Sequence, residues 1–186
     1  MFCVVKPRQS PEFAVPRPPA KHAAQGDGPS ADYFVRADGP LKPADAVAAL
    51  LVLEDGRYVM QLRDASPNIF YPNHWGCFGG AVDAGERSLE ALQHELREEL
   101  EYELDNANEF TRFDFDLTQL GQPKVSRIYF EVFVPPQAFR RFVLHEGADM
   151  QALAGQDLLV ERQTTPYDAF AIWMHMSKRR FASARG

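Results

Sequence analysis

Hydrophobic and polar positions in the first part of the chain follow a strand–turn–strand pattern. Ala46–Leu53 is a continuous apolar run followed by a Glu-Asp-Gly turn, which predicts a buried strand and a hairpin. Residues 57–63 alternate between polar and apolar side chains and are predicted to return as the partner strand. Residues 64–73 contain two prolines and predict a loop, whereas residues 74–79 predict a short strand that ends at a pair of glycines.

A stretch with helical periodicity follows the glycines and is expected to form a helix over residues 88–101. At about 100° per residue, three leucines fall within about 60° of Leu89 and form a stripe with it. This is the pattern of an amphipathic helix that packs one face on a core. The stripe consists of Leu89, Leu92, Leu96 and Leu100.

The rest of the chain predicts further strands and a closing helix. Residues 109–117 and 125–134 are predicted as a hairpin, and residues 142–145 as an additional strand. Residues 156–161 predict one helical turn, and residues 165–181 a helix with proline at its first position and a basic last turn. Strands on both sides of a central helix, with a second helix at the end, predict an α/β sandwich with a mixed sheet.

Composition separates the first 43 residues from the rest of the chain. Residues 1–43 hold eight of the fourteen prolines, and we interpret them as a flexible, Pro-rich arm. Within this arm, residues 33–35 could pair with the body as a short edge strand. Residues 44–186 are expected to form the folded domain.

The net charge, the apolar runs and the cysteines limit the partners and the location that we expect for this protein. The net charge is −6, which argues against a nucleic acid polymer as partner, and an acidic body needs a metal ion to bind an anionic small molecule. The longest apolar run is too short to span a membrane, and we see no signal peptide, so we expect a cytoplasmic protein. Cys3 and Cys77 make no disulfide framework or metal spacing, and Cys77 is interpreted mainly as a packing residue.

The polar face of the central helix carries candidate chemistry. Glu95, Glu98 and Glu99 share one face, where each pair repels by about a few tenths of a kcal/mol. One interpretation is a solvated acidic face and the other is a cation site. Glu99 borders the leucine stripe and favours the cation, because a carboxylate at a core margin should be paired or bound to metal. Oxygen ligands without a His or Cys cluster suit Mg²⁺ or Mn²⁺.

The loop before this helix supports phosphoryl chemistry. Glycines at 79, 80 and 85 permit tight bends that bring Glu86 back towards the helix face. A metal at such a site neutralises phosphate charge and activates water.

Residues 80–102 resemble the Nudix box of the MutT-type hydrolases, G-x5-E-x7-R-E-U-x-E-E-x-G-U, in which U is bulky and apolar. The resemblance implies an α/β/α sandwich, a divalent metal (Mg²⁺, with Mn²⁺ as an option) and cleavage of a nucleoside diphosphate linked to another moiety. That substrate class includes nucleotide sugars, dinucleotides and nucleoside triphosphates. The matching positions are Gly80, Glu86, Glu95, Leu96, Glu98 and Glu99.

Two positions depart from the box. His94 stands where the box has the arginine that anchors the loop and the glutamates. Glu101 replaces the glycine that ends the helix, so the helix is expected to run on through residues 102–104. The alternative function is therefore a catalytically weak nucleotide-binding module or sensor on the same fold.

The resemblance also implies residue roles. Glu95, Glu98 and Glu99 would be catalytic metal ligands, and Glu86 an outer ligand or a structural partner. Glu146, followed by glycine, would be the fourth ligand or the general base, although an ordinary surface turn explains it equally well.

The substrate is expected to be a small nucleotide diphosphate derivative, contacted by residues from several elements. Gly80 belongs to the phosphate-facing loop. Arg63 and Arg127 could reach a phosphate, the alternative for Arg63 being a strand-end residue in solvent. Trp75 could stack on a base or pack in the core. A homodimer is one option for the assembly.

Overall fold

The computed structural model describes residues 43–66 and 68–183, with side chains up to residue 178. The predicted arm, apart from its last residue, and the strand expected at 33–35 lie outside the described residues. Eleven helices and strands are found in the described part. In chain order they are β1 Ala46–Leu53, β2 Tyr58–Leu62, β3 Trp75–Gly76, α1 Ser88–Leu100, β4 Asn108–Asp116, the 3-10 helix η1 Thr118–Leu120, β5 Lys124–Val134, α2 Pro136–Phe139, β6 Asp149–Leu153, α3 Gly155–Val160 and α4 Pro166–Ser183.

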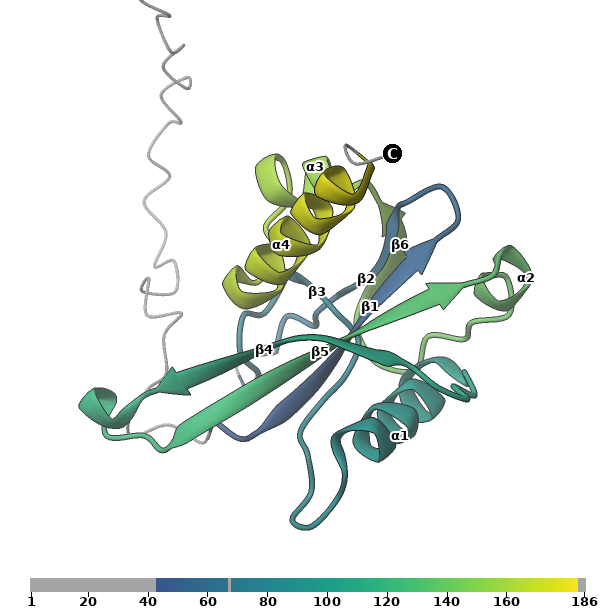
Figure 1. Cartoon of the computed structure of the whole chain (residues 1–186). Coiled ribbons are helices and arrows are strands. Elements are labelled where there is room, and N and C mark those ends of the chain that lie inside the picture. Colours follow the sequence, from purple (N-terminus) through teal and green to yellow (C-terminus); the bar gives the residue numbers. More distant parts are fainter. Residues whose placement is uncertain (1–42, 67, 184–186) are drawn as a thin grey trace, which may run out of the picture. The chain divides into compact units, whose positions relative to one another are not determined.

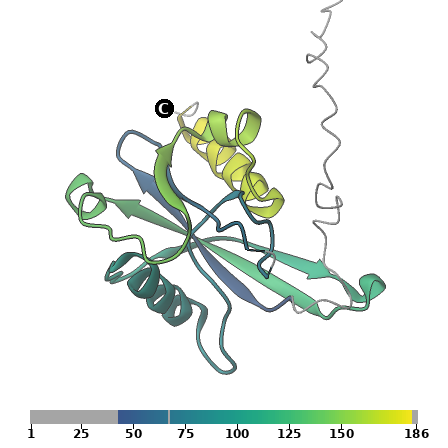
Figure 2. The ribbon, with the colours of Figure 1, turned by 180° about the vertical axis from the view of Figure 1, so that it is seen from behind.

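The strands form one mixed sheet in the order β3-β2-β1-β5-β4, with β6 paired to β2. β1 runs parallel to β5 over the full length of β1, from Ala46 opposite Arg127 to Leu53 opposite Val134. The other strand pairs are antiparallel, including the β1–β2 and β4–β5 hairpins that the sequence predicts. Seen from behind, β6 lies beside β2 (Figure 2).

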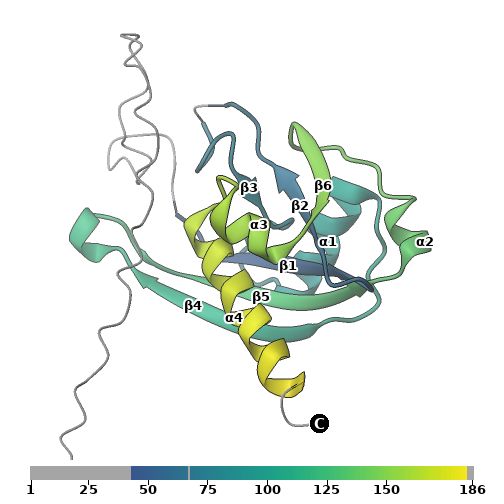
Figure 3. The same cartoon turned by 90° about the horizontal axis from the view of Figure 1, so that it is seen from above.

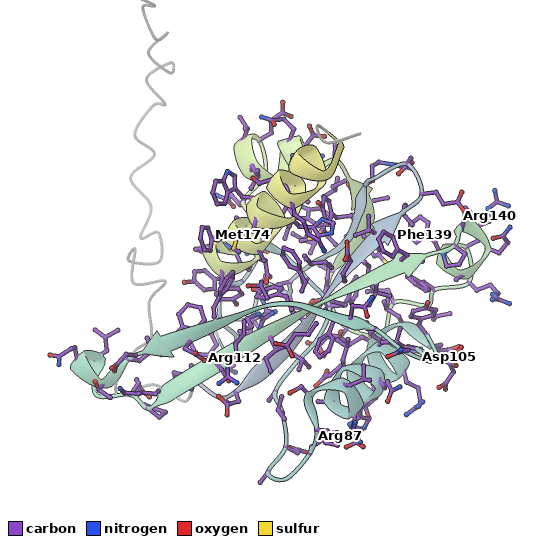
Figure 4. The ribbon with its side chains drawn as sticks, in the orientation of Figure 1. Arg87, Asp105, Arg112, Phe139, Arg140 and Met174 are labelled. Atoms are coloured by element: carbon purple, nitrogen blue, oxygen red, sulfur yellow. The ribbon has the colours of Figure 1, made fainter. Side chains whose placement is uncertain are left out.

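Helices cover both faces of the sheet, so the α/β/α sandwich is confirmed. α1 lies on one side, and α3 and α4 lie on the other (Figure 1). α4 lies across β1 and β5 when the structure is viewed from above (Figure 3). Side chains fill the space between the sheet and each helical layer (Figure 4).

The two cores follow from the alternation of side chains along β1, because successive strand residues point to opposite faces. Val47, Ala49 and Leu51 face α1, whereas Ala48 and Leu50 face α4. The leucine stripe of α1 packs as predicted, and burying each leucine contributes roughly 1.5–3 kcal/mol. Leu92, Leu96 and Leu100 are fully buried.

The prediction of a strand at residues 142–145 is wrong. These residues form an irregular segment after α2, and the next strand is β6, which begins at Asp149. The physical reason is a tertiary interaction with the end of α1, because the last carbonyls of a helix lack partners inside it. The amides of Val143 and His145 donate to the carbonyls of Leu100 (3.2 Å) and Glu99 (3.0 Å).

The continuation of α1 through residues 102–104 is also wrong. Glu101 takes a left-handed conformation, with φ 53° and ψ 33°, although it is not a glycine. Its carboxylate lies 2.8 Å from the ring nitrogen Nε2 of His145. This contact gives a physical reason for a glutamate to occupy a position that usually selects glycine.

The closing helix, the helical turn and the loop between β2 and β3 agree with the sequence prediction. Pro166 is the first residue of α4. The strand expected over 74–79 is shorter than predicted and covers only Trp75–Gly76. None of the helices in the described ranges is long and apolar enough to cross a membrane.

Candidate active site

Glu99 lies where α1 meets the glycine loop and is almost completely buried, with 5% exposed. Its Oε2 accepts a hydrogen bond from the Gly79 amide at 2.9 Å, and its Oε1 lies 3.5 Å from the Gln61 amide nitrogen. Burial raises the pKa of Glu99 to about 8. The Gly79 hydrogen bond opposes this rise, whereas the negative charges of Glu146 and Glu95 add to it.

Glu95 lies one helical turn before Glu99 and faces the same loop. Burial raises the pKa of Glu95, and the carboxylates of Glu146, Glu98 and Glu86 raise it further, against a smaller opposing effect of His94. A β-carbon at position 80 would overlap the Glu95 carboxylate. Gly80 therefore leaves the space into which Glu95 projects.

Glu146 comes from the far end of the domain sequence but lies near the helix glutamates. The backbone carbonyl oxygen of Glu146 accepts a hydrogen bond from Gln61 at 2.9 Å. The negative charge of the Glu146 carboxylate raises the pKa values of Glu95 and Glu99. The structure thus places Glu146 close enough for its charge to act on both Glu95 and Glu99. The role of Glu146 as ligand or base stays a prediction.

Glu86 and Glu98 lie at the margin of this group. The Asp83 amide donates to Oε2 of Glu86 at 3.2 Å, which fixes the tight turn before α1. Glu98 is mostly exposed, and its Oε1 lies 3.1 Å from Nε2 of His94, one turn earlier in the helix. His94 therefore pairs along the helix surface with the Glu98 carboxylate.

The oxygen atoms of these glutamate side chains are of the kind that binds a hard divalent cation. Among the residues that the structure describes, no three His, Cys, Asp or Glu side chains already converge as a ligand set. Mg²⁺ commonly keeps several waters and uses only one or two carboxylates together with substrate phosphates. A cation would also offset the burial and the repulsion that together raise the pKa values of Glu95 and Glu99.

Arg63 follows β2 and holds the neighbouring loop. Its Nε donates a hydrogen bond to the carbonyl oxygen of Phe70 at 2.8 Å. The half-buried arginine is therefore engaged with the protein at one of its nitrogens. A phosphate contact by Arg63 stays a prediction.

Trp75 and Arg127, which the sequence suggested for substrate binding, lie on the α4 face of the sheet. Trp75 is 6% exposed and belongs to the core that includes Ile172, which favours packing over base stacking. The Arg127 side chain is 15% exposed, and its Nε lies 3.5 Å from Oδ1 of Asp168. Burial alone would lower the pKa of Arg127, but the Asp168 carboxylate raises it overall.

Asp168 is a structural centre that the sequence prediction missed. Its Oδ2 accepts hydrogen bonds from the Cys77 amide (3.0 Å) and the Thr165 hydroxyl (2.6 Å). Its Oδ1 accepts one from the Tyr129 hydroxyl at 2.7 Å. Cys77 is buried as predicted, and burial raises the pKa of its thiol. The sequence signal for Asp168 was an acidic residue in the first turn of a helix, but its partners come from distant strands.

Gln61 was also missed, although the sequence contains a signal for it. It is a polar residue in a strand whose neighbouring side chains are apolar and buried. Gln61 itself is 2% exposed and contacts the glutamate group directly.

Solved structures with a similar fold include MutT-type proteins. The MutT protein from Methanosarcina mazei Go1 superposes with a TM-score of 0.59, at 20% identity over 75% of this chain and 96% of that chain. The ORF135 protein of E. coli gives a TM-score of 0.58 at 23% identity, over 76% of this chain and 96% of that chain. At these identities, the likeness concerns the fold.

Curated relatives match a shorter stretch. The nucleoside triphosphatase NudI of Escherichia coli O139:H28 is 42% identical over 50 residues, which is 27% of this chain. The match spans about a third, 35%, of that relative's length. A model of the NUDIX domain matches residues 42–146, more than half of the chain. The chain therefore belongs to the Nudix family, whose box residues lie on α1 and the loop before it.

Proposed function

We propose that this protein is a divalent-metal-dependent pyrophosphohydrolase that cleaves a nucleoside diphosphate linked to another moiety. The observation that carries the proposal is that Glu95 and Glu99, on one face of α1 beside the glycine loop, are both acted on by the negative charge of Glu146. Three carboxylates from two distant segments repel one another there, which is costly unless a cation is bound in the working state. Membership of the Nudix family supports hydrolysis of a phosphoanhydride bond as the reaction class.

In this proposal Glu95, Glu98 and Glu99 hold Mg²⁺ or Mn²⁺, and Glu86 contributes as an outer ligand. A metal held by these residues would neutralise phosphate charge and favour a nucleophilic water. The loop at Gly80 leaves room for the Glu95 carboxylate and lets the backbone approach a phosphate.

The chain's own residues would complete the hydrolysis. Glu146 accepts a proton from the water that attacks phosphorus, a new P–O bond forms and the bridging P–O bond breaks. The products are a nucleoside monophosphate and a phosphorylated group or pyrophosphate. Arg63, which directly follows β2, is proposed to contact a phosphate once substrate displaces part of its present environment.

Nucleoside triphosphates are the first substrates to test, because the matched relative is named a nucleoside triphosphatase. Nucleotide sugars and dinucleotides form the rest of the panel.

The experiment is a phosphate- and nucleotide-release assay on this panel with Mg²⁺ or Mn²⁺. We expect turnover by the wild type, and a loss of about 10²-fold or more in Glu98→Gln and in Glu99→Gln, because each loses a charged oxygen ligand. Glu90→Gln is the matched control, since Glu90 is exposed and pairs with Arg87 at the start of the same helix. Equal activity in all four proteins would contradict the proposal.

A second candidate is a nucleotide-binding module with weak turnover. The observation behind it is the pairing of His94 with Glu98, which occupies a proposed ligand with a surface contact. This candidate predicts thermal stabilisation by nucleotide with metal and no turnover on any panel member. Turnover that disappears in Glu99→Gln would exclude it.

A further inference from the structure

Gln61 is a buried polar side chain in the otherwise apolar strand β2. The preceding β2 residues Tyr58, Val59 and Met60 are at most 1% exposed, and Gln61 is 2% exposed. Burying an amide without hydrogen bonds costs about 1–3 kcal/mol. A glutamine at this position is therefore stable only if its amide finds partners inside the protein.

Those partners are two parts of the proposed catalytic group. The Gln61 Nε2 donates to the carbonyl oxygen of Glu146 at 2.9 Å and lies 3.5 Å from Oε1 of Glu99. An amide nitrogen has two hydrogens, so it can serve both acceptors at once. One side chain thus connects the helix carboxylate with the backbone that carries the loop carboxylate.

The Glu146 loop also packs directly on Gln61. Gly147 has φ 91°, and a β-carbon there would lie 2.6 Å from Cγ of Gln61 and 2.9 Å from the carbonyl oxygen of Leu62. The Ala148 amide donates to that same Leu62 carbonyl at 2.8 Å. The loop therefore follows the surface that β2 and Gln61 present.

The opposite side of the loop is attached to α1. The His145 amide donates to the carbonyl of Glu99 at 3.0 Å, so Glu146 lies between an anchor on the helix and an anchor on the strand. The Glu146 side chain is itself exposed. Its placement relative to Glu99 consequently depends on the backbone contacts on either side of it.

We propose that Gln61 is a positioning residue that sets Glu146 against Glu99 for the reaction. The inference rests on the proposed function, and it assigns Gln61 no direct contact with substrate. Removing its amide should loosen the loop and misplace Glu146, while the fold and the remaining carboxylates stay in place.

The test compares Gln61→Met with Gln151→Met. Methionine keeps a similar volume and removes the amide. Gln151 is a matched control, because it lies on the neighbouring strand β6 and its amide bonds only to the nearby Asp149 at 2.6 Å among the described residues. Gln61→Asn serves as a second variant if Gln61→Met fails to fold, since the shorter amide stays polar but does not reach both acceptors.

The first readout does not need turnover. Hydrogen–deuterium exchange should rise at least about threefold in the segment 143–148 of the Gln61 variant, with no rise in Gln151→Met. Unchanged exchange in that segment would overturn the proposal, whether or not the protein hydrolyses anything. Absence of wild-type turnover would instead contradict the proposed function alone.

The second readout is kinetic. We expect kcat of Gln61→Met to fall about tenfold or more with KM changed less than about threefold, because positioning of a base acts on the chemical step. In a Glu146→Gln background the same substitution should add less than about twofold. A loss that multiplies fully with that of Glu146→Gln would show that Gln61 does not act through Glu146.

Discussion

At the scale of single residues, Glu99 shows how the site opposes folding. Glu99 is buried, and the charges of two other carboxylates act on it; among the described residues, the Gly79 amide and the more distant Gln61 amide are the hydrogen-bond donors that compensate its charge. Such an arrangement is costly in the free protein and becomes favourable when a cation is present. The free energy of unfolding of the metal-free protein should therefore depend on whether Glu99 is protonated or charged.

The pH dependence of Glu99→Gln is the first prediction from this feature. The pKa of Glu99 is about 8 in the folded protein, above the ordinary value of 4.5. Between these values the folded state holds a proton that the unfolded state lacks, so wild-type stability falls as pH rises. Glu99→Gln should be more stable than wild type by on the order of a few kcal/mol at pH 8.5, since one pKa unit is worth about 1.4 kcal/mol.

The measurement is urea unfolding in a chelator at pH 5 and pH 8.5. The advantage of Glu99→Gln should shrink towards pH 5, where Glu99 is already largely protonated. Adding Mg²⁺ at pH 8.5 should stabilise the wild type more than the variant. A stability difference that is the same at both pH values would contradict this account.

Residue spacing alone was enough to predict which glutamates share the helix face, because helical geometry is local. It could not find Gln61 or Asp168 as organising residues. Their partners lie on other elements, such as Glu146 for Gln61 and Tyr129 for Asp168. Those contacts exist only once the sheet has formed.

At the scale of elements, the glycine loop and the end of α1 explain where the sequence prediction succeeded and failed. The periodic leucines set the helix and its face correctly. The end of the helix depends on the segment 142–146, which supplies amides to its last carbonyls and His145 to Glu101. A sequence rule that looks for glycine at the helix end cannot detect such a tertiary partner.

The two adjacent glycines of the loop should respond differently to alanine. Gly79 has φ 129°, and a β-carbon there would lie 2.9 Å from the Ala48 backbone, so Gly79→Ala should cost about 1–3 kcal/mol of stability. At Gly80 the obstacle is the movable end of Glu95, so Gly80→Ala should fold nearly normally and lose activity.

Urea unfolding and the hydrolysis assay together separate these outcomes. Gly80→Ala should keep its unfolding free energy within about 1 kcal/mol while its activity falls about tenfold or more. An active Gly80→Ala, or a variant as unstable as Gly79→Ala, would show that position 80 does not act through the Glu95 carboxylate.

At the scale of the whole described structure, the sheet separates two kinds of charged group. The α1 face carries carboxylates that repel one another. The α4 face carries Asp168 and Arg127, which are paired and hydrogen-bonded. The second group ties α4 to the strands, and it explains why Arg127 and Trp75 are better understood as supporting the fold.

Asp168→Ala should therefore destabilise the protein without touching the proposed metal ligands. Removing it leaves buried Arg127 without its carboxylate partner, and breaking a buried pair costs about 3–5 kcal/mol. Asp114→Ala is the control, because its pair with Arg112 is exposed to solvent and should contribute little to stability. Urea unfolding measures both, and equal losses would contradict the assignment.

The parallel pairing of β1 with β5 has a consequence for the time course of folding. Ala46 and Arg127 are partners although they lie about eighty residues apart in the chain, and α1 lies within the segment that they enclose. At synthesis rates of about 5–20 residues per second, the first strand waits roughly 4–16 s for its neighbour. During that interval the apolar side of α1 has only part of its sheet to cover it. The newborn chain thus leaves one edge of β1 and part of the apolar side of α1 uncovered until β5 has been made.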